Sequence, residues 1–401
     1  MSRAWAVFIL ASLTFFLSQF YRAANAVISP QLVADLSLDT EGLGLLSASF
    51  FYAFAVTQIP ITLLLDRVGA RKMMSALMLV GIAGAMIFSM AKDLNVGIVG
   101  RILMGAGMAC NLMGTLKLLT LWFGPLRFAT LSGIVFAIGS MGNMAATSPY
   151  VLVVERMGWR LSFKAIAILN LLILMVFFRV VQEKPVSAPR KGEGIGSDLR
   201  LLLRRKNFWI ISAATMVNYG VFAAFQTLWA GPFLIEAIGL SPLYAGNLIF
   251  LINLASIVGS PIWGYLSDRL KTRKWIIFGG QLMLALVTFM MVGVRPRTGV
   301  GVLAMLFFGF GFFRVTGSLM YAQIKESMPV RMAGTAMTGI NFFTMLGPAI
   351  FLQGLGTLMQ TYYPAASRGQ EAFAVAFFLC AALIAGISIV YLFTDDTISV
   401  K

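Results

Sequence analysis

The stretch "DRVGARK" at residues 66–72 returns as "DRLKTRK" at residues 268–274, 202 positions further along the chain. A second stretch repeats at nearly the same interval, because "PLRFA" at 125–129 returns as "PVRMA" at 329–333, 204 positions later. Both intervals are about half of the 401 residues. Two separate stretches that repeat at half the chain length predict an internal duplication, with two halves that run in the same order.

The chain around these repeats is too apolar for a soluble protein. It is 59% hydrophobic and 11% charged, with a mean hydropathy of +0.87, whereas soluble domains are roughly 45–50% apolar and about 25% charged. Twelve apolar runs are long enough to cross a bilayer, at residues 4–27, 42–65, 73–91, 94–117, 128–150, 162–181, 207–230, 243–266, 275–294, 300–322, 333–355 and 372–394. We therefore predict an all-α membrane protein with twelve transmembrane helices.

The repeats divide these runs into two sets of six, because each repeated stretch lies in the corresponding loop of its own half. Between the sets, the segment 182–206 contains Pro, Gly, Ser and a dense cluster of Lys and Arg, which is typical of a linker. We predict a six-helix half over residues 1–181, a basic cytoplasmic linker over 182–206 and a second six-helix half over 207–401.

The positions of the basic residues predict the orientation in the membrane, because cytoplasmic loops collect Lys and Arg. If the N-terminus is cytoplasmic, only seven of the 31 basic residues lie outside, namely Lys92, Arg156, Arg160, Lys164, Arg295, Arg297 and Arg368. This bias predicts that both termini are cytoplasmic, in a multi-pass protein that we expect in a bacterial inner membrane. The net charge of +16 is then a property of the inner loops, and we expect no nucleic-acid partner.

Composition also argues against several classes of protein. The sequence has no His, and Cys110 and Cys380 lie far apart within apolar runs, so we expect no His-dependent hydrolytic triad, no zinc or haem site and no disulfide framework. The sequence leaves no room for a soluble enzymatic domain and has no phosphate-binding G-x-x-x-x-G-K-[ST] loop, so we expect neither an enzyme nor a cofactor. The first run resembles a signal sequence, with a cleavage site at Ala24–Ala26, but its removal would break the repeat.

The motifs resemble those of the major facilitator superfamily of secondary transporters over essentially the whole chain. The stretch "DRVGARK" is similar to the superfamily's G-x-x-x-D-R-x-G-R-R signature, although Thr62 replaces the first Gly and Ala70 shifts the basic pair. The stretches "GRILMGAGMA" at 100–109, "WFGPLRFA" at 122–129 and "GWRLSF" at 158–163 add to the resemblance. It implies alternating access around a central site lined by the first, fourth, seventh and tenth helices.

The two Asp-Arg loops suit a gate on physical grounds as well. An Asp at the inner end of a helix, followed by Arg and Lys about one turn later, can pair with neighbouring helix ends in one conformation and release them in another. The candidate gating residues are Asp66, Arg67, Arg71 and Lys72 in the first copy, and Asp268, Arg269, Arg273 and Lys274 in the second. The alternative is that these charges only anchor the topology.

Three arginines, Arg22, Arg101 and Arg314, fall inside the predicted helices, whereas all fifteen Asp and Glu lie in loops or at helix ends. Each buried Arg costs roughly 2.5–3.5 kcal/mol on insertion scales, so it should face water, a partner or an anionic solute. The stretch "YRAANAVISP" at 21–30 resembles the first helix of organic-anion and organophosphate transporters of the superfamily. The resemblance to the organophosphate exchangers implies a basic residue on the seventh helix, but the run 207–230 has none. We expect Arg314 to take its place. For Arg101, a structural or gating role competes with contact to the solute.

Polar and aromatic side chains in the same helices complete the candidate substrate site. They are Tyr21, Asn25, Asn111, Asn218, Tyr219, Gln226 and Trp229, with Asn341 as a further candidate on the eleventh helix. The spacing of Asn218, Phe222, Gln226 and Trp229 predicts one shared helix face. The alternative for each Asn or Gln is a hydrogen bond to a neighbouring helix.

Together these features predict a secondary active transporter for a small organic anion, either a carboxylate or a phosphate ester. We expect it to work as a monomer in the lipid bilayer. The alternatives are an exporter of amphiphilic or drug-like compounds and a solute sensor that binds without transporting. Because no His and no intramembrane Asp or Glu is available to titrate, two routes of coupling remain. The proton is carried by the acid group of the solute, or one anion exchanges for another, and we expect exchange.

Overall fold

The computed structural model describes residues 3–123, 125–182, 201–328 and 333–397. Inside the helices, the side chains at 62, 63, 66, 67, 125–130, 333–335 and 338 lie outside the described part. The chain divides into two compact units, Met1–Arg190 and Lys191–Lys401. All regular secondary structure in the described residues is helical. The predicted linker 182–206 lies largely outside the described residues.

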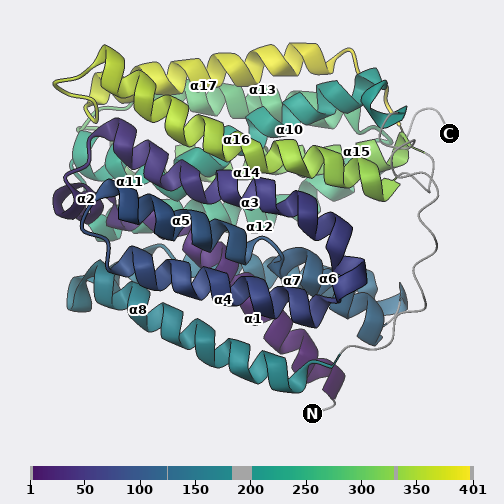
Figure 1. The fold of residues 1–401 in the computed structure, drawn as a ribbon. Coiled ribbons are helices and arrows are strands. Elements are labelled where there is room, and N and C mark those ends of the chain that lie inside the picture. The colour runs from purple at the N-terminus through teal and green to yellow at the C-terminus, as the bar shows by residue number, and fades with distance from the viewer. Residues whose placement is uncertain (1–2, 124, 183–200, 329–332, 398–401) are drawn as a thin grey trace. The chain divides into compact units, whose positions relative to one another are not determined.

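The helices of the first unit run side by side (Figure 1). They are α1 (Arg3–Ala23), α2 (Asn25–Leu36), α3 (Thr40–Val68), α4 (Ala70–Ser89), α5 (Leu94–Met108), α6 (Asn111–Phe123), α7 (Pro125–Ala145) and α8 (Ser148–Val180). Within α8, Gly158 has a φ of 72°, so the chain turns there and the sixth predicted helix begins at Trp159. Glycine suits this position because it adopts positive φ without steric strain.

The second unit repeats this order. Its α-helices are α10 (Lys206–Ala224), α11 (Ala230–Pro232), α12 (Pro242–Arg269), α13 (Lys274–Met290), α14 (Val300–Arg314), α15 (Leu319–Glu326), α16 (Ala333–Tyr362) and α17 (Gln370–Tyr391). Short π-helical turns cover Phe225–Trp229 and Phe233–Ala237, and 3-10 turns cover Met291–Gly293 and Val315–Ser318. Eleven described helical segments are long and apolar enough to cross a membrane, and Leu131–Ala145 is a shorter apolar helix. This confirms the predicted all-helical membrane fold.

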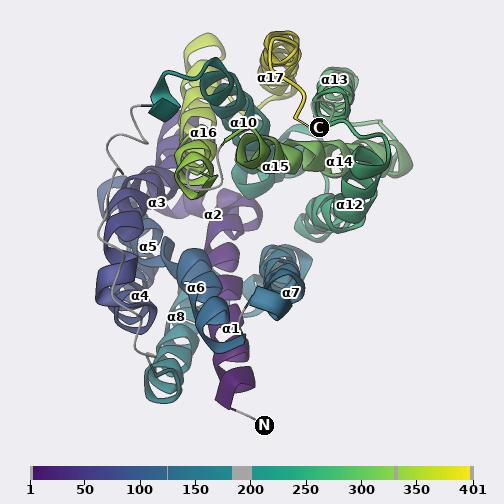
Figure 2. The same cartoon turned by 90° about the vertical axis from the view of Figure 1, so that its right-hand side faces the viewer.

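The helices that correspond in the two units have the same neighbours. In the first unit α3 packs on α5, α1 on α7 and α4 on α8, and in the second unit α12 packs on α14, α10 on α16 and α13 on α17. Figure 2 shows each unit with its helices nearly end on. Two copies of one packing pattern are what the repeated stretches predict.

Pairs of glycines make the closest of these contacts possible. A Cβ on Gly105 of α5 would lie 2.1 Å from the carbonyl oxygen of Phe50 in α3, and a Cβ on Gly311 of α14 would lie 2.2 Å from that of Ile252 in α12. Such distances leave no room for a side chain, so glycine is required for the helices to approach this closely.

A second pair of glycines repeats in the same way. A Cβ on Gly142 of α7 would lie 2.3 Å from the carbonyl oxygen of Phe16 in α1, and a Cβ on Gly347 of α16 would lie 2.2 Å from that of Met216 in α10. These contacts place Phe16 and Met216 at matching positions in the two units.

The helices expected to line the central site are interrupted in mid-span, where the sequence predicts continuous runs. The first span breaks at Ala24 between α1 and α2, and the fourth breaks between α5 and α6 at Ala109 and Cys110. The seventh contains the two π-helical turns, and the tenth narrows into the 3-10 turn Val315–Ser318 after Arg314. Each interruption changes the pattern of backbone hydrogen bonds, and a backbone group that loses its partner at membrane depth must bind another protein group, water or a ligand.

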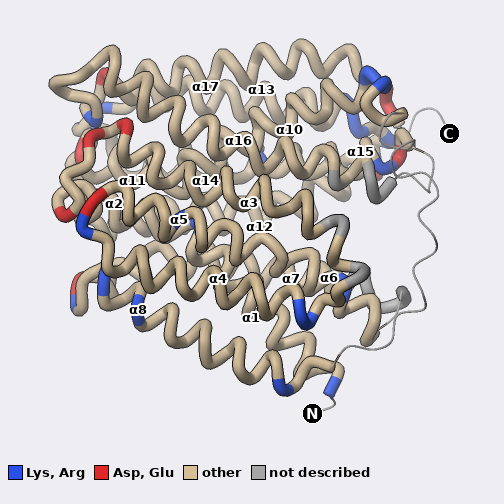
Figure 3. Tube along the Cα trace, in the orientation of Figure 1, with Lys and Arg blue, Asp and Glu red and all other residues tan. Residues whose placement is uncertain are grey.

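Charged residues gather at the ends of the helices (Figure 3). At one end of the first unit the described charged side chains are all basic and include Arg3, Arg71, Lys72 and Arg179, whereas the other end carries both signs. The prediction that the basic end faces the cytoplasm depends on this separation of charge.

Candidate functional site

Arg22 is the penultimate residue of α1, just before the break at Ala24. Its side chain is only 6% exposed, and its guanidinium carbon lies 5.0 Å from the ring centre of Phe54 and 5.6 Å from that of Phe51, both in α3. The aromatic faces are attractive to a cation, so they support the charge in this buried position. Arg22 is therefore a buried cation directly beside the break in the helix.

Arg314 is the last residue of α14 and lies directly before the 3-10 turn of the tenth span. Its guanidinium carbon lies 4.1 Å from the ring centre of Phe222 and 5.2 Å from that of Tyr219, both in α10. Within the described residues it forms no ion pair, and its Nε atom has no hydrogen-bond partner. Arg314 is thus a cation in the membrane interior whose donors are available to an anion.

The two arginines occupy related places although they belong to different helices of the repeat. Because Phe16 and Met216 match, Arg22 in α1 corresponds to Phe222 in α10, six residues further along in each case. The ring of Phe222 is covered by the guanidinium of Arg314 from the tenth span. The second unit therefore brings a positive charge to the face of its first helix from a neighbouring helix, and the replacement of a basic residue of the seventh span by Arg314 stays a prediction.

Arg101 has a different environment from the other two arginines. It is completely buried, donates a hydrogen bond of 3.0 Å from Nη1 to the carbonyl oxygen of Tyr21, and lies 4.8 Å from the ring centre of Phe50. The carbonyl of Tyr21 lies just before the break in the first span, so Arg101 ties α5 to this break. The contacts favour the structural side of the two roles predicted for Arg101.

The polar candidates of the first unit bind neighbouring helices. Asn25 donates from Nδ2 to the hydroxyl of Ser47 at 3.0 Å, and Asn111 donates to the carbonyl oxygen of Thr14 at 3.1 Å. Tyr21 is fully buried, with its ring 6.1 Å from that of Phe163 in α8. These contacts join the first span to α3, α6 and α8, and a role of the three residues in binding a solute stays a prediction.

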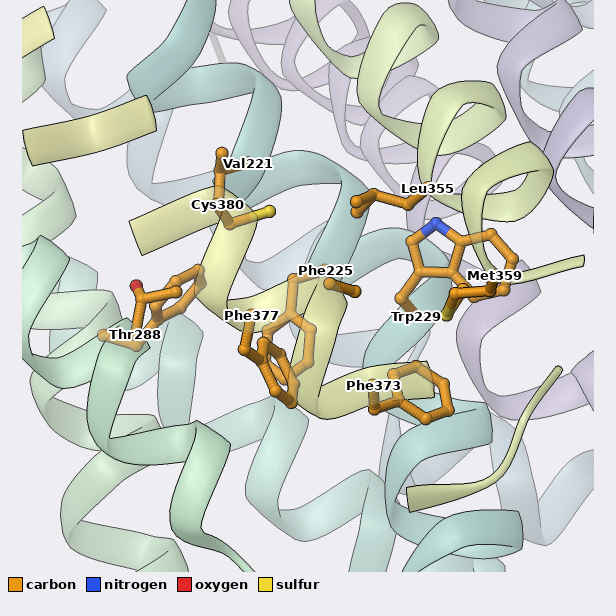
Figure 4. A pocket seen from close by; sticks show the side chains of 11 residues that line it. Val221, Phe225, Trp229, Thr288, Leu355, Met359, Phe373, Phe377 and Cys380 are labelled. Carbon is orange, nitrogen blue, oxygen red and sulfur yellow. The ribbon is translucent and has the colours of Figure 1, made fainter. Parts of the chain in front are cut away.

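The candidates of the seventh span do not share one face. Gln226 donates from Nε2 to Oδ1 of Asn253 in α12 at 2.6 Å, whereas Trp229 lines a cavity of about 20 Å³ inside the second unit together with Val221 and Phe225 (Figure 4). The physical reason is the π-helical turn Phe225–Trp229, which is wider than an α-helical turn and rotates the following residues. The predicted alignment of Gln226 with Trp229 is therefore wrong.

This cavity has room for about one water molecule and is lined almost entirely by apolar side chains. Trp229 is 2% exposed, and its Nε1 has no hydrogen-bond partner in the described part of the chain. Asn218 is also buried, and its Oδ1 lies so close to Gly317 in the tenth span that a Cβ there would be 2.3 Å away. Asn218 thus packs the seventh span against the tenth beside Arg314, while Trp229 faces the interior of the unit.

Tyr321 is a polar residue near Arg314 that the sequence analysis missed. Its hydroxyl contacts Oδ1 of Asn341 at 2.9 Å and Oγ1 of Thr344 at 3.0 Å, which joins the tenth span to α16. A signal was present in the sequence, because Tyr321 follows Arg314 by seven residues, a spacing that places two residues on one helix face.

The second Asp-Arg loop forms a network of ion pairs. Arg273 contacts Oδ1 of Asp268 at 2.7 Å and Oε1 of Glu326 at 3.1 Å, and its backbone N–H donates to Asp396 at 3.0 Å. Partial burial acts to lower the pKa of Arg273, but the hydrogen bonds and negative charges of Glu326 and Asp268 outweigh this and raise the pKa. Asp268 and Arg273 thus join α12, α15 and the C-terminal segment. Arg269 is exposed at the end of α12. Lys274 begins α13, and its Nζ lies 5.5 Å from the ring centre of Trp275.

In the first Asp-Arg loop, the side chains of Asp66 and Arg67 lie outside the described residues. Arg71 donates from Nη2 to the carbonyl oxygen of Phe178 at 2.7 Å and lies over that ring at 4.2 Å. The basic residue after the motif therefore binds the C-terminal end of α8, where the carbonyls of a helix attract positive charge. Among the described residues, no group of three His, Cys, Asp or Glu could hold a metal ion.

A family model described as Major Facilitator Superfamily matches residues 10–352. The chain belongs to the major facilitator superfamily. Two solved structures share the fold of this superfamily member. A crystal structure of a D-xylose-proton symporter has a TM-score of 0.73 at 15% identity and covers 96% of this chain and 97% of its own. An inward-facing, occupied structure of a bacterial homologue of the human lysosomal transporter Spinster has a TM-score of 0.76 at 17% identity, with 96% of each chain covered.

Curated relatives within the major facilitator superfamily include transporters of organic acids. The hexuronate transporter of Bacillus subtilis (strain 168) is 23% identical over 354 residues, 82% of each chain. The probable sulfoacetate transporter SauU of Cupriavidus necator is 25% identical over 372 residues, 84% of each chain. The D-galactonate transporter of Escherichia coli O6:H1 is 23% identical over 377 residues, 85% of this chain and 86% of its own. The protein is accordingly a multi-pass membrane transporter.

Proposed function

We propose that this protein is a secondary active transporter of a small organic anion, a carboxylate or a phosphate ester, that works by alternating access. The observation that carries the proposal is Arg314, an intramembrane guanidinium with no ion pair among the described residues and with aromatic rings on one side. A solute anion would supply the missing negative charge. The names of the relatives, which include a hexuronate, a sulfoacetate and a D-galactonate transporter, support an acid as the solute.

Guanidinium chemistry explains why an anion is the expected solute. Arginine is always charged and presents donors in a planar fork that matches the two oxygens of a carboxylate or phosphate. The rings of Phe222 and Tyr219 lie beside the guanidinium of Arg314, and those of Phe51 and Phe54 lie beside that of Arg22. Rings of this kind leave the in-plane donors of a guanidinium to another partner. In this proposal Arg22 and Arg314 are both candidates for recognition of the transported anion.

The Asp-Arg loops act as gates in this proposal, with both termini in the cytoplasm. The network around Arg273 holds the ends of α12 and α15 together with the C-terminal segment. Asp268 is 67% exposed, so solvent screens its pair with the partly buried Arg273. Such a pair contributes no more than about 1 kcal/mol, which is weak enough to break during each transport cycle.

The proposal is tested with the variants Arg22→Ala and Arg314→Ala, and with Arg204→Ala as the control because Arg204 is an exposed basic residue within the predicted linker. Thermal shift of the purified proteins is measured against a panel of hexuronate, galactonate and sulfoacetate. The wild type and the control should be stabilised by at least one acid, whereas both site variants should fold but lose that stabilisation, since a ligand stabilises only the state that binds it. Equal stabilisation of both site variants would refute the anion assignment.

Flux in proteoliposomes separates a transporter from a sensor on the same fold. A transporter carries the acid that stabilises it into the vesicle, whereas a sensor binds it without accumulation inside. Stabilisation by an acid combined with no flux in either direction would contradict the proposed transport.

A further inference from the structure

A groove of about 580 Å³ runs between α4 and α8 on the first unit. The two helices pack side by side (Figures 1 and 2). The residues that line the groove all belong to these two helices. The residues that matter for its chemistry are Lys72, Ser75, Ala76 and Leu79 of α4, and Met175 and Arg179 of α8. None of these has been placed in the candidate substrate site.

The groove is basic at one end and apolar along the rest. Lys72 lies in the first turn of α4 and Arg179 in the last turn of α8, so both charges lie at the basic end of the unit. Away from this end, Leu79 is 53% exposed and Met175 is 44% exposed. Apolar side chains with this exposure on a membrane helix are suited to contact with hydrocarbon.

A buried hydroxyl lies just below the charges. Ser75 is 7% exposed and follows Lys72 by about one helical turn, and its Oγ has no hydrogen-bond partner in the described part of the chain. A buried hydroxyl without a partner loses its hydrogen bond to water and gains nothing in return. Ser75 lines the groove, so a rotation of its side chain would bring the hydroxyl to polar atoms of an occupant, which would supply the missing partner.

We propose that the groove between α4 and α8 binds one anionic phospholipid, with its phosphate at Lys72 and Arg179, its ester oxygens near Ser75 and an acyl chain against Leu79 and Met175. The order of groups along the groove, first charge, then a polar donor, then hydrocarbon, is the order of groups along a phospholipid. Basic pockets between transmembrane helices bind the head groups of anionic lipids. A free phosphate ion would use the charges but leave the apolar part of the groove uncovered.

The test is native mass spectrometry of the full-length protein in a non-ionic detergent, titrated with phosphatidylglycerol or with phosphatidylcholine of the same acyl chains. We expect one tightly retained phosphatidylglycerol and weaker binding of phosphatidylcholine. The double variant Lys72→Gln, Arg179→Gln should weaken phosphatidylglycerol binding roughly thirtyfold, because each basic residue near an anionic lipid contributes about a fivefold effect. Its control is Arg204→Gln, Lys325→Gln, which removes the same charge from exposed positions of the second unit.

The variant Ala76→Phe tests the apolar part without altering charge, because Ala76 is exposed in the groove and a phenyl ring would fill it. It should elute as a monodisperse protein and lose the retained lipid. Equal binding of both lipids, an unaltered affinity in the Lys72 and Arg179 double variant, or full retention of lipid by Ala76→Phe would each overturn the proposal. Displacement of the lipid by inorganic phosphate would also overturn it, because the site would then be one for a free anion.

Discussion

Replacing Gly311 by alanine tests how tightly the tenth span packs on the eighth. The new Cβ would lie 2.2 Å from the carbonyl oxygen of Ile252, 2.9 Å from its carbonyl carbon and 3.0 Å from its Cα. All three are backbone atoms, so no side chain can rotate away and α14 must move from α12. Overpacking of this kind costs typically 1–3 kcal/mol, and we expect Gly311→Ala to lie in the upper half of that range.

The matched control is Gly386→Ala in α17, where an added Cβ would have no heavy atom within 4 Å. This change removes a flexible glycine from a helix without a clash and should stabilise by at most about 0.5–1 kcal/mol. Thermal unfolding of both variants in detergent, followed by the loss of monodisperse protein on gel filtration, gives the comparison. A midpoint for Gly311→Ala equal to or above that of the wild type would refute the close packing inferred for this interface.

Three further predictions concern the arginines, the gate and the coupling. Arg101→Gln should lower the unfolding midpoint, because a hydrogen bond to a charged group contributes about 1.5–3 kcal/mol and the carbonyl of Tyr21 would lose its partner; a loss of acid binding at an unaltered midpoint would instead assign Arg101 to the solute. Asp268→Asn removes the 2.7 Å ion pair with Arg273 and should slow exchange between the inward and outward states by up to about fivefold, because Asp268 is 67% exposed and the pair is weak. Acid binding should weaken less than this. Distance measurements between spin labels on the two units follow the exchange, and a larger effect on binding than on exchange would contradict the gating role. Counterflow at equal pH should exceed uptake driven by a pH gradient alone, because an empty cationic site opposes closure until an anion neutralises it; strong pH-driven accumulation of a permanently charged anion without stimulation by internal substrate would contradict exchange.

The helices could be predicted from the sequence because bilayer thickness sets their length and hydrocarbon sets their composition. Their interruptions could not, because these depend on contacts between distant residues. The 3-10 turn Val315–Ser318 shows the reason. It lies where Gly280 of α13 approaches Thr316 so closely that a Cβ would be 2.2 Å from Cγ2 of Thr316, and where Gly317 meets Asn218.

Part of the candidate site was also accessible from the sequence. A charge inside an apolar run is conspicuous because it is expensive there, and this pointed to Arg22, Arg101 and Arg314. What surrounds each arginine was not accessible, since Phe222 lies under Arg314 only through the packing of α10 against α14.

The seventh span shows how a local irregularity defeats a periodicity argument. A spacing of three and four residues predicts a shared face only in a regular α-helix. The π-helical turn from Phe225 to Trp229 directs the side chains of Gln226 and Trp229 to different neighbours. No residue type in that turn would have allowed its prediction from the sequence. The ion pair of Arg273 with Glu326 was equally hidden, because the two residues are 53 positions apart.

Uptake of radiolabelled D-glucuronate and D-glucose into proteoliposomes tests the central claim most directly, because the two solutes share a sugar skeleton and differ in the carboxylate that an arginine would bind. The account predicts saturable uptake of glucuronate and no uptake of glucose. Galactonate or sulfoacetate should compete with glucuronate for the site. It also predicts that Arg314→Ala abolishes the uptake of the acid. Uptake of glucose at the rate of the acid, or acid uptake that is unaffected by Arg314→Ala, would contradict the account.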